Sequence, residues 1–414
     1  MSEPLTETQT LAKRTKWAYV STRVLDTPFW GIFNMLPFIL YKDLHATPYQ
    51  LAVLITLKPL VSILSSYWSV WINQRSERIV GNIICTRLLA ILPFFFFPFF
   101  DSPWFFIASF GLYMMLASSL VPAWMELLKQ NIPKVKRENI FSFTQVFGYF
   151  GGGLLPFVLG GVLDDYNQAW RWIFPLAGAI SLGASIFQWN IIIKPGTSVE
   201  GIASQKFSHH LMKPWKSAWN LLKQRPDFTK YQIGFMLIGG GLMIMQPALP
   251  VYFVDVLHLS YMEFAVALTL CKGIGFAAGS PLWSKWINRT NIYRFSGSIA
   301  ALACCFPAAL LLTQSQIVWL YIGYFAYGFM QSGNELSWNM SGPIFSKEQD
   351  STVYTSINVM AVGVRGAFIP ILGALLIALF DASFVMVLGG IICFFATLLF
   401  FGYAFTEQKQ TLKV

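Results

Sequence analysis

Two hexapeptides decide the fold of this chain: WSVWIN at residues 68–73 and WSKWIN at residues 283–288. The chain is 414 residues long, and the likeness between its halves continues upstream of both hexapeptides in the same order. The matching pairs are Leu36-Pro37 with Leu249-Pro250, Leu44-His45 with Leu257-His258, and Thr56-Leu57 with Thr269-Leu270. Self-similarity at a nearly constant spacing indicates that one half of the chain repeats the other.

The composition places most of the chain in a membrane. Hydrophobic residues make up 55% of it and charged residues 12%, and the mean hydropathy is +0.55. An ordinary soluble protein carries about 25% charged residues. A helix needs roughly 20 apolar residues to cross the hydrocarbon core. Twelve segments are suitable, at residues 17–41, 49–72, 79–100, 103–128, 139–163, 170–193, 231–255, 261–284, 291–313, 316–340, 352–379 and 382–405.

These segments predict an all-α membrane protein with twelve transmembrane helices in two pseudo-symmetric six-helix bundles. Runs such as 89–100 and 391–401 are apolar on every face, which excludes the alternation typical of barrel strands. The predicted domains are an N-terminal bundle over residues 1–193, a cytoplasmic linker over 194–230, and a C-terminal bundle with a short cytoplasmic tail over 231–414. A parallel repeat of this kind predicts a central cleft between its halves.

Basic residues set the expected orientation. Most of the 29 lysines and arginines fall in the first polar segment and in every second loop after it. The positive-inside rule therefore predicts a multi-pass protein with both termini in the cytoplasm, and we expect the bacterial inner (plasma) membrane. Anionic headgroups explain the net charge of +10, so membrane lipids and not nucleic acid are the expected partner. We expect a monomer.

Signatures of enzymes and cofactor proteins are missing from the sequence. The five cysteines fall in predicted spans without CxxC spacing, which predicts neither a disulfide framework nor a metal site. There is no P-loop GxxxxGK[ST], HExxH or GxSxG motif. An intramembrane protease or acyltransferase is the nearest enzymatic alternative, but all four histidines lie in predicted loops or at helix mouths. We therefore expect no enzyme, no cofactor and no metal.

One stretch resembles a known family. RENIFSFTQVFGYFGGGLLPFVLGG at residues 137–161, followed by WRWIF at 170–174, is similar to the fifth helix and the start of the sixth helix of the major facilitator superfamily. The resemblance implies secondary transport by alternating access. In that family the loop between helices 2 and 3, echoed between helices 8 and 9, carries a glycine, an aspartate and basic residues that latch a cytoplasmic gate.

This chain departs from that latch. Asn73 and Asn288 stand at the aspartate positions, and serines stand at the glycine positions. Asparagine can accept a hydrogen bond from a helix N-terminus, but it lacks the charge that favours a helix dipole. We therefore expect a weaker or differently built latch. Its predicted residues are Asn73, Arg75, Arg78, Asn288 and Arg289.

Basic residues inside the spans predict where a substrate binds. Lys58, Lys272 and Arg365 fall near the middle of their helices, where an unpaired charge is costly. Lys58 and Lys272 occupy matching places in the two halves, so with Arg365 they predict a cationic centre for an anion. The alternative is that each lysine pairs with a carboxylate to stabilise one gate state. Arg23 and Arg87 lie shallower, and we expect them to extend towards the cytoplasm.

Three acidic residues are the candidates for proton coupling: Asp26, Glu126 and Glu335. Asp26 follows Arg23 by three positions, so the two share a helix face, and an ion pair between them is the alternative to a coupling role. Glu335 lies in a polar stripe, which favours a cavity over a lipid-facing surface. Polar and aromatic residues on the same faces complete the predicted substrate site. Its residues are Lys58, Lys272, Arg365, Trp30, Asn34 and Asn334.

The sequence as a whole predicts a secondary active transporter that moves a small organic anion or zwitterion with protons, by symport and alternating access. A multidrug-type proton antiporter that exports amphipathic compounds is the first alternative, because 38 Phe, 15 Trp and 14 Met could line an adaptable apolar cavity. A transport-inactive sensor of the same fold is the second, because the latch aspartates are missing. The expected partners are a small-molecule substrate, a coupling proton and membrane lipids.

Overall fold

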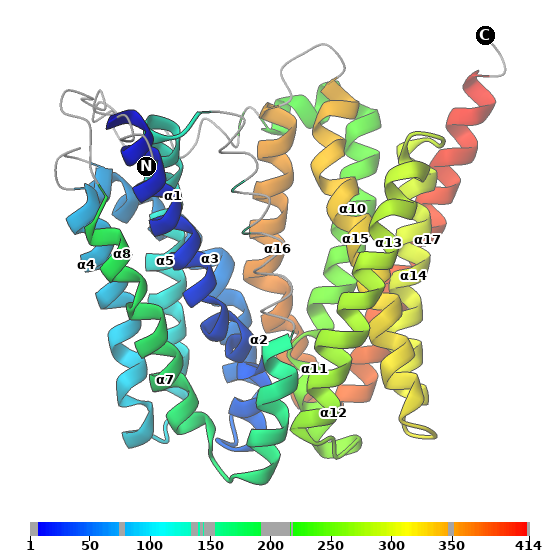
Figure 1. Ribbon diagram of the computed structural model, residues 1–414. Helices are drawn as coiled ribbons and strands as arrows, with labels where there is room; N and C mark the ends of the chain where they lie inside the picture. Colours follow the sequence, from blue (N-terminus) through cyan, green and yellow to red (C-terminus); the bar gives the residue numbers. More distant parts are fainter. Residues whose placement is uncertain are drawn as a thin grey trace. The chain divides into compact units, whose positions relative to one another are not determined.

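The computed structural model of the protein describes residues 7–73, 79–133, 140, 144, 154–191, 216, 218–346 and 352–411. Within these ranges the chain is helical almost throughout and forms no β-strand (Figure 1). Contacts between Cα atoms divide the chain into two units. Unit 1 comprises Met1–Ala46, Leu57–Ala203 and Ser260–Ala265, and unit 2 comprises Thr47–Thr56, Ser204–Leu259 and Val266–Val414.

Unit 1 contains most helices of the first repeat. In it α1 packs against α8 and α5, α4 packs against α5, and α2 packs against α7. Figure 1 shows α4, α8, α5 and α1 side by side. The elements are α1 (Glu7–Leu25), α2 (Thr27–Lys42), most of α3 (Pro48–Asn73), α4 (Ile79–Ile91), the 3₁₀ helix η2 (Leu92–Phe99), α5 (Pro103–Asn131), a helical stretch over 154–165, α7 (Trp170–Leu182), α8 (Ala184–Trp189) and α12 (Tyr261–Ala265).

Unit 2 contains the remaining elements. These are α10 (Pro226–Met245), α11 (Ala248–Val251), the π-helices η3 (Tyr252–Val256) and η4 (Val266–Cys271), α13 (Lys272–Ile287), α14 (Ile292–Leu312), α15 (Val318–Ser346), α16 (Thr352–Leu379) and α17 (Ala382–Thr411). A Cβ at Gly275 would collide with the carbonyl of Phe325, and one at Gly328 would collide with that of Lys272. Small residues therefore let α13 and α15 pack backbone to backbone.

The predicted all-α membrane fold is confirmed. Among the described residues, eight helical stretches are long and apolar enough to cross a membrane, namely Ile79–Phe99, Pro103–Val121, Trp170–Trp189, Pro226–Val256, Tyr261–Ile287, Ile292–Leu312, Ile357–Leu379 and Ala382–Glu407. α1 with α2, α3 and α15 coincide with three further predicted spans. Residues 154–163 of the predicted span over 139–163 are helical, while most of its first part and most of the linker over 194–230 lie outside the described residues.

Two helix breaks in unit 1 position its polar residues. α1 and α2 meet at Asp26, with Pro28 in the first turn of α2. Proline lacks the N–H that a continuous helix needs and clashes with the carbonyl four residues earlier, so the helix breaks there. α7 and α8 meet at Gly183, two residues after Ser181. Carbonyls in the last turn of a helix lack helical partners, so Ser181 is placed to accept hydrogen bonds from other helices.

An aromatic core fills unit 1 beside these breaks. Phe29 stacks on Tyr113 with ring centroids 5.2 Å apart, and it meets Phe94 edge to face at 4.7 Å. Phe94 also contacts Phe33 at 5.4 Å and Phe174 at 6.0 Å. All five rings are buried. Each such pair contributes about 0.5–1.5 kcal/mol beyond area burial, so the cluster holds α2, η2, α5 and α7 together.

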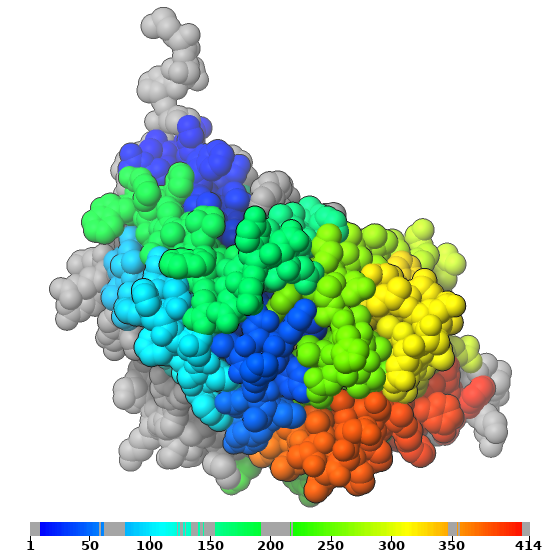
Figure 2. Space-filling model, turned by 90° about the horizontal axis from the view of Figure 1, so that it is seen from below, coloured from blue at the N-terminus to red at the C-terminus, as the bar shows by residue number. Residues whose placement is uncertain are grey.

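α12 is fixed within unit 1 at one end of the helices. The carboxylate of Asp164 accepts hydrogen bonds from the backbone N–H groups of Tyr261 and Met262, both at 2.8 Å. Phe38 stacks on Phe264 with centroids 4.7 Å apart and meets Tyr261 edge to face at 5.1 Å. Figure 2 shows the end of α2, in blue, beside α12, in yellow-green. Polar and aromatic contacts therefore hold the start of α12.

Candidate functional site

A buried ion pair lies where α4 and α7 meet the break between α1 and α2. Arg87 contacts Asp26 in a bidentate manner: Nη1 donates to Oδ2 at 3.2 Å, and Nη2 donates to Oδ1. Nε and Nη2 of Arg87 also donate to the carbonyl oxygen of Ser181, at 3.2 and 2.6 Å. The Ser181 hydroxyl donates to Asp26 Oδ1 at 2.5 Å. Arg87, Asp26 and Ser181 thus form one closed network.

Burial makes this network costly to disrupt. Arg87 is only 4% exposed. Removal of one partner of a buried pair leaves an uncompensated charge and costs about 3–5 kcal/mol. Next to the pair, Gln188 Nε2 donates to Thr22 Oγ1 at 2.9 Å, and the Thr22 hydroxyl donates to the Ala18 carbonyl at 2.7 Å. α8 and α1 are therefore joined directly beside the ion pair.

A cavity of about 260 Å³ opens beside Asp26 and Arg87. One side of it is aromatic, because the rings of Trp30 and Tyr113 meet edge to face with centroids 6.1 Å apart. Ligand cavities commonly combine such apolar walls with a few placed polar groups. The polar lining residues are Thr22, Arg23, Asp26, Arg87 and Ser118, and the apolar ones include Trp30, Tyr113, Met114, Val121 and Trp124.

Arg23 brings a second cation to this cavity. Its Nε donates to the Tyr19 hydroxyl at 3.4 Å, and its guanidinium carbon lies 5.5 Å from the centroid of the Tyr19 ring. No carboxylate in the described part of the chain forms an ion pair with Arg23. The described lining of the cavity therefore includes two arginines and one carboxylate, and these three side chains together carry a net positive charge.

Two expectations about this region are wrong. Asp26 does not pair with Arg23, its neighbour on the same helix face, because its carboxylate lies against Arg87 and Ser181. Arg87 does not extend towards the membrane surface, because the same contacts bury it. Sequence reasoning missed Arg87 and Ser181 as site residues. The available signal was the cost of a charge inside the apolar span Ile79–Phe99.

Unit 2 holds another buried cation, the predicted site residue Arg365. It is 7% exposed, its Nη1 donates to the Phe235 carbonyl at 2.8 Å, and its guanidinium carbon lies 5.1 Å from the centroid of the Phe235 ring. Among the described residues, no carboxylate pairs with it and its Nε lacks a hydrogen-bond partner. The guanidinium occupies the space beside Gly239, where an added Cβ would overlap it.

The other predicted residues of unit 2 lie on α13 and α15. Lys272 begins α13, and its Nζ lies 5.3 Å from the centroid of the Tyr327 ring. Asn334 and Glu335 are partly exposed on α15. The side-chain amide of Asn339 donates to the backbone carbonyl of Glu335 at 2.9 Å. The roles of Lys272, Asn334 and Glu335 in substrate and proton binding stay predictions.

The structure describes only part of the remaining predicted site. On α2, Trp30 lines the cavity of unit 1, and Asn34 is exposed outside it. At the end of α13, the amide of Asn288 donates to the Ser284 carbonyl of the same helix at 3.1 Å, and Arg289 is exposed. Outside the described residues lie Arg75, Arg78 and the side chains of Lys58, Asn73 and Glu126.

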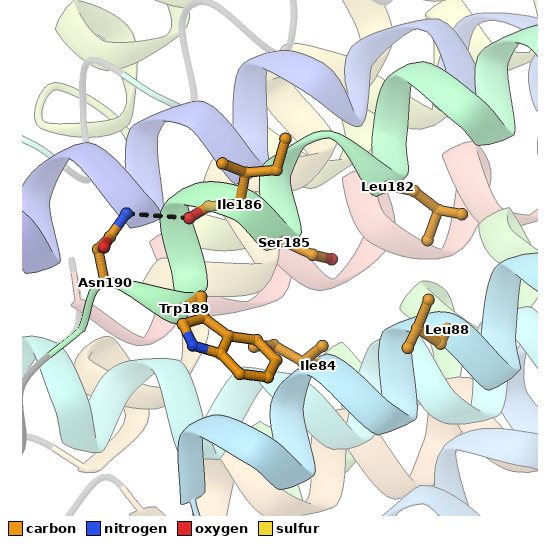
Figure 3. A pocket seen from close by; sticks show the side chains of 7 residues that line it. All are labelled: Ile84, Leu88, Leu182, Ser185, Ile186, Trp189 and Asn190. Atoms are coloured by element: carbon orange, nitrogen blue, oxygen red, sulfur yellow. Dashed lines mark hydrogen bonds between the residues drawn. The ribbon is translucent and has the colours of Figure 1, made fainter.

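A second hollow lies on an exposed face of unit 1, between α4 and α8 (Figure 3). Its volume is about 500 Å³, and the lining residues that the structure describes are all uncharged. At one end the amide of Asn190 donates to the carbonyl of Ile186 at 3.1 Å. This apolar groove differs in chemistry from the cavity at Asp26. Its lining residues are Ile84, Leu88, Leu182, Ser185, Ile186, Trp189 and Asn190.

Similarity to known proteins assigns the family. The family model of the Major Facilitator Superfamily matches residues 20–343. The chain belongs to the Major Facilitator Superfamily. The proton-coupled antiporter flippase LtaA of Staphylococcus aureus (strain MSSA476) is 25% identical over 257 residues, which are 59% of this chain and 59% of that protein. LtaA of Staphylococcus epidermidis is 25% identical over 316 residues, 72% of each chain. This chain therefore spans 59% of the length of the S. aureus relative.

Solved structures of superfamily transporters share the fold. The nucleoside transporter NupG superposes with a TM-score of 0.66 at 14% identity, covering 95% of this chain and 98% of that one. A POT family transporter in complex with a thioalcohol conjugated peptide gives 0.67 at 12% identity, covering 94% of this chain and 95% of that one. At such low identity the likeness shows the fold alone.

Proposed function

We propose that this chain is a proton-coupled secondary transporter of a small organic anion, and that the anion binds in the cavity beside Asp26. One observation carries the proposal: among the described lining residues of the cavity, Arg23 and Arg87 stand beside one carboxylate, that of Asp26. An anion there would meet an uncompensated positive charge, while Trp30 and Tyr113 supply apolar surface. Membership of a transporter superfamily supports transport over sensing.

The ion pair supplies a means of coupling. An ionised Asp26 neutralises Arg87 and holds its guanidinium. A proton on Asp26 would remove that negative charge and free Arg87 to contact the anion. The proton therefore favours anion binding, and by linkage the anion favours proton binding to the same extent. Symport requires that each ligand, the proton or the anion, strengthens the binding of the other.

Other residues enter this proposal as further contacts. Arg365 is the candidate anion contact of unit 2, because it is buried and has no described carboxylate partner. We also propose that the protein works by alternating access, that both termini lie in the cytoplasm, and that Asn73 and Asn288 form the cytoplasmic latch. The further substrate contacts are Lys58, Lys272, Asn34 and Asn334, and the further proton sites are Glu126 and Glu335.

A second candidate function is proton antiport of amphipathic compounds. The relatives named LtaA are described as proton-coupled antiporter flippases. The apolar side of the cavity, with Met114, Val121 and Trp124, would also suit a compound with a hydrocarbon part. A cationic compound would be attracted by the ionised Asp26 and would compete there with the proton, which is the negative coupling that antiport requires.

Transport in vesicles separates the two functions. A thermal-shift screen of organic anions and amphipathic compounds on the purified chain first finds a ligand, because a ligand that binds the folded state raises its stability. Symport predicts that the anion accumulates in vesicles with an alkaline lumen, and antiport predicts accumulation in vesicles with an acidic lumen. A compound that binds but is not moved across the membrane would support the transport-inactive sensor.

Substitutions then test the site. Asp26→Asn should abolish the response to a pH gradient but preserve exchange of labelled for unlabelled anion. Arg23→Gln should weaken anion binding about tenfold or more, as loss of a charge-assisted hydrogen bond would. Lys285→Gln, an exposed change on α13, is the control and should match the parent. Parental affinity in Arg23→Gln would place the anion site elsewhere.

A further inference from the structure

The apolar groove between α4 and α8 contains one polar group that lacks a partner. The Ser185 hydroxyl is buried and forms no hydrogen bond with any residue that the structure describes. It lies on a wall of the groove, where Figure 3 shows its oxygen among the side chains of Leu182, Leu88 and Ile84. Buried hydroxyls are normally hydrogen-bonded, so an unpartnered one beside an open groove points to a ligand that brings an acceptor.

The position of the groove indicates the chemistry of that ligand. Its walls belong to the candidate membrane spans Ile79–Phe99 and Trp170–Trp189, so hydrocarbon surrounds it. The end of the groove at Trp189 and Asn190 is amphipathic, and the Trp189 side chain is largely exposed. Tryptophan favours the level of the lipid headgroups. Ser185 lies four residues, or about 6 Å of helix rise, further in than Trp189.

We propose that this groove is a phospholipid site, in which one acyl chain lies between α4 and α8 and its ester carbonyl accepts a hydrogen bond from Ser185. Bilayer lipid is as apolar as the groove, so the apolar walls alone give no preference for a particular lipid. The specific part of the binding is therefore the hydrogen bond, together with the shape of the groove. This site is separate from the cavity at Asp26 and does not depend on the proposed function.

The hydroxyl can be tested with two lipids that differ only in one acceptor. The probes are phosphatidylglycerol with ester-linked chains and its ether-linked analogue, which lacks the carbonyls. Native mass spectrometry of the purified full chain measures how much of each lipid stays bound as detergent is raised. The parent should bind the ester lipid about fivefold more tightly than the ether lipid, the ratio expected of one neutral hydrogen bond. In Ser185→Ala the ratio should fall to one.

The groove itself can be tested by filling it. Ser185→Phe from the α8 wall and Leu88→Trp from the α4 wall should each remove the tightly held lipid. Leu176→Phe, at a site on α7 that is 62% exposed and outside the groove, is the matched control and should keep it. Two filling variants on different helices protect the test against one of them failing to fold. Parental retention in a folded filling variant, or an ester-to-ether ratio unchanged by Ser185→Ala, would overturn the proposal.

Discussion

The carboxylate of Asp164 accepts the backbone N–H of Tyr261 at 2.8 Å, and so caps the first turn of α12 from another helix. The second oxygen of Asp164 accepts a hydrogen bond from the N–H of Met262 at the same distance. The first N–H groups of a helix have no partner within the helix, and a negative charge there also favours the helix dipole. Lys42 adds to the contact, because its Nζ lies 3.9 Å from Asp164 and 4.4 Å from the centroid of the Tyr261 ring.

Loss of this cap should loosen the start of α12. Asp164→Ala should destabilise the turn by about 1–2 kcal/mol, the usual range for a lost capping side chain. Backbone amides in Ser260–Ala265 should then exchange with deuterium roughly 5- to 30-fold faster, read by mass spectrometry. Asp165→Ala, at the exposed neighbouring acid, is the control and should leave the exchange unchanged. Equal exchange in both variants would contradict the cap.

The Asp26–Arg87 pair should behave as a buried unit in thermal unfolding. Asp26→Asn or Arg87→Gln alone should lower stability by about 3–5 kcal/mol, because each leaves a partner without compensation. The double variant should recover part of that loss. The control is Asp101→Asn, since the side chain of Asp101 is 77% exposed although it pairs with Arg171. Exposed pairs are worth about 0–1 kcal/mol. A fully additive double variant would show that the two side chains do not act together.

The helices could be predicted because their signal is local. A run of apolar residues long enough for a membrane gave the span 291–313, and the structure has α14 at Ile292–Leu312. Pro28 was the local signal for the break between α1 and α2, because proline removes a helical hydrogen bond, but the single predicted span over 17–41 did not include that break. Such features depend on neighbours along the chain. Length and hydropathy are therefore enough to place a span, and a proline inside the span marks a break.

The site could be predicted only in part. Asp26 and Trp30 share a helix face, and the structure places both at the cavity. The partner of Asp26 could not be derived, because Arg87 is 61 residues away and Arg23 only three. Which of the two arginines pairs depends on how α4 and α7 pack, and no spacing in the sequence encodes that. Arg365 could be identified because a charged residue is energetically costly in a membrane span, but its position beside Gly239 could not be predicted.

Arg225 should stabilise the beginning of α10 in unit 2. Its guanidinium makes two hydrogen bonds with Asp227, at 3.0 and 2.8 Å, and also reaches the Tyr354 hydroxyl at 2.7 Å and the Phe345 carbonyl at 2.8 Å. The hydrogen bond with Asp227 raises the pKa of Arg225, so its charge persists at alkaline pH.

A lysine cannot reproduce this planar set of donors. Arg225→Lys should therefore cost about 1–3 kcal/mol, and faster amide exchange should appear at Pro226–Met245. Lys223→Arg, a change of the same kind two residues earlier, is the control. Stability equal to the parent in Arg225→Lys would mean that the four hydrogen bonds contribute little.

Two adjacent glycines in α10 should respond oppositely to the same substitution. A Cβ at Gly239 would overlap the guanidinium of Arg365, whereas one at Gly240 would meet no atom of the described residues within 4 Å. Gly239→Ala should therefore displace Arg365 and lower stability by about 1–3 kcal/mol, the usual cost of overpacking. Gly240→Ala should raise it by about 0.4–1 kcal/mol, because alanine loses less conformational freedom on folding. Thermal unfolding of the two variants gives the signs. If Arg365 contacts the transported anion, Gly239→Ala should also weaken anion binding, and Gly240→Ala should not. Equal stability changes in the two variants would show that the position of Arg365 does not depend on the space beside Gly239.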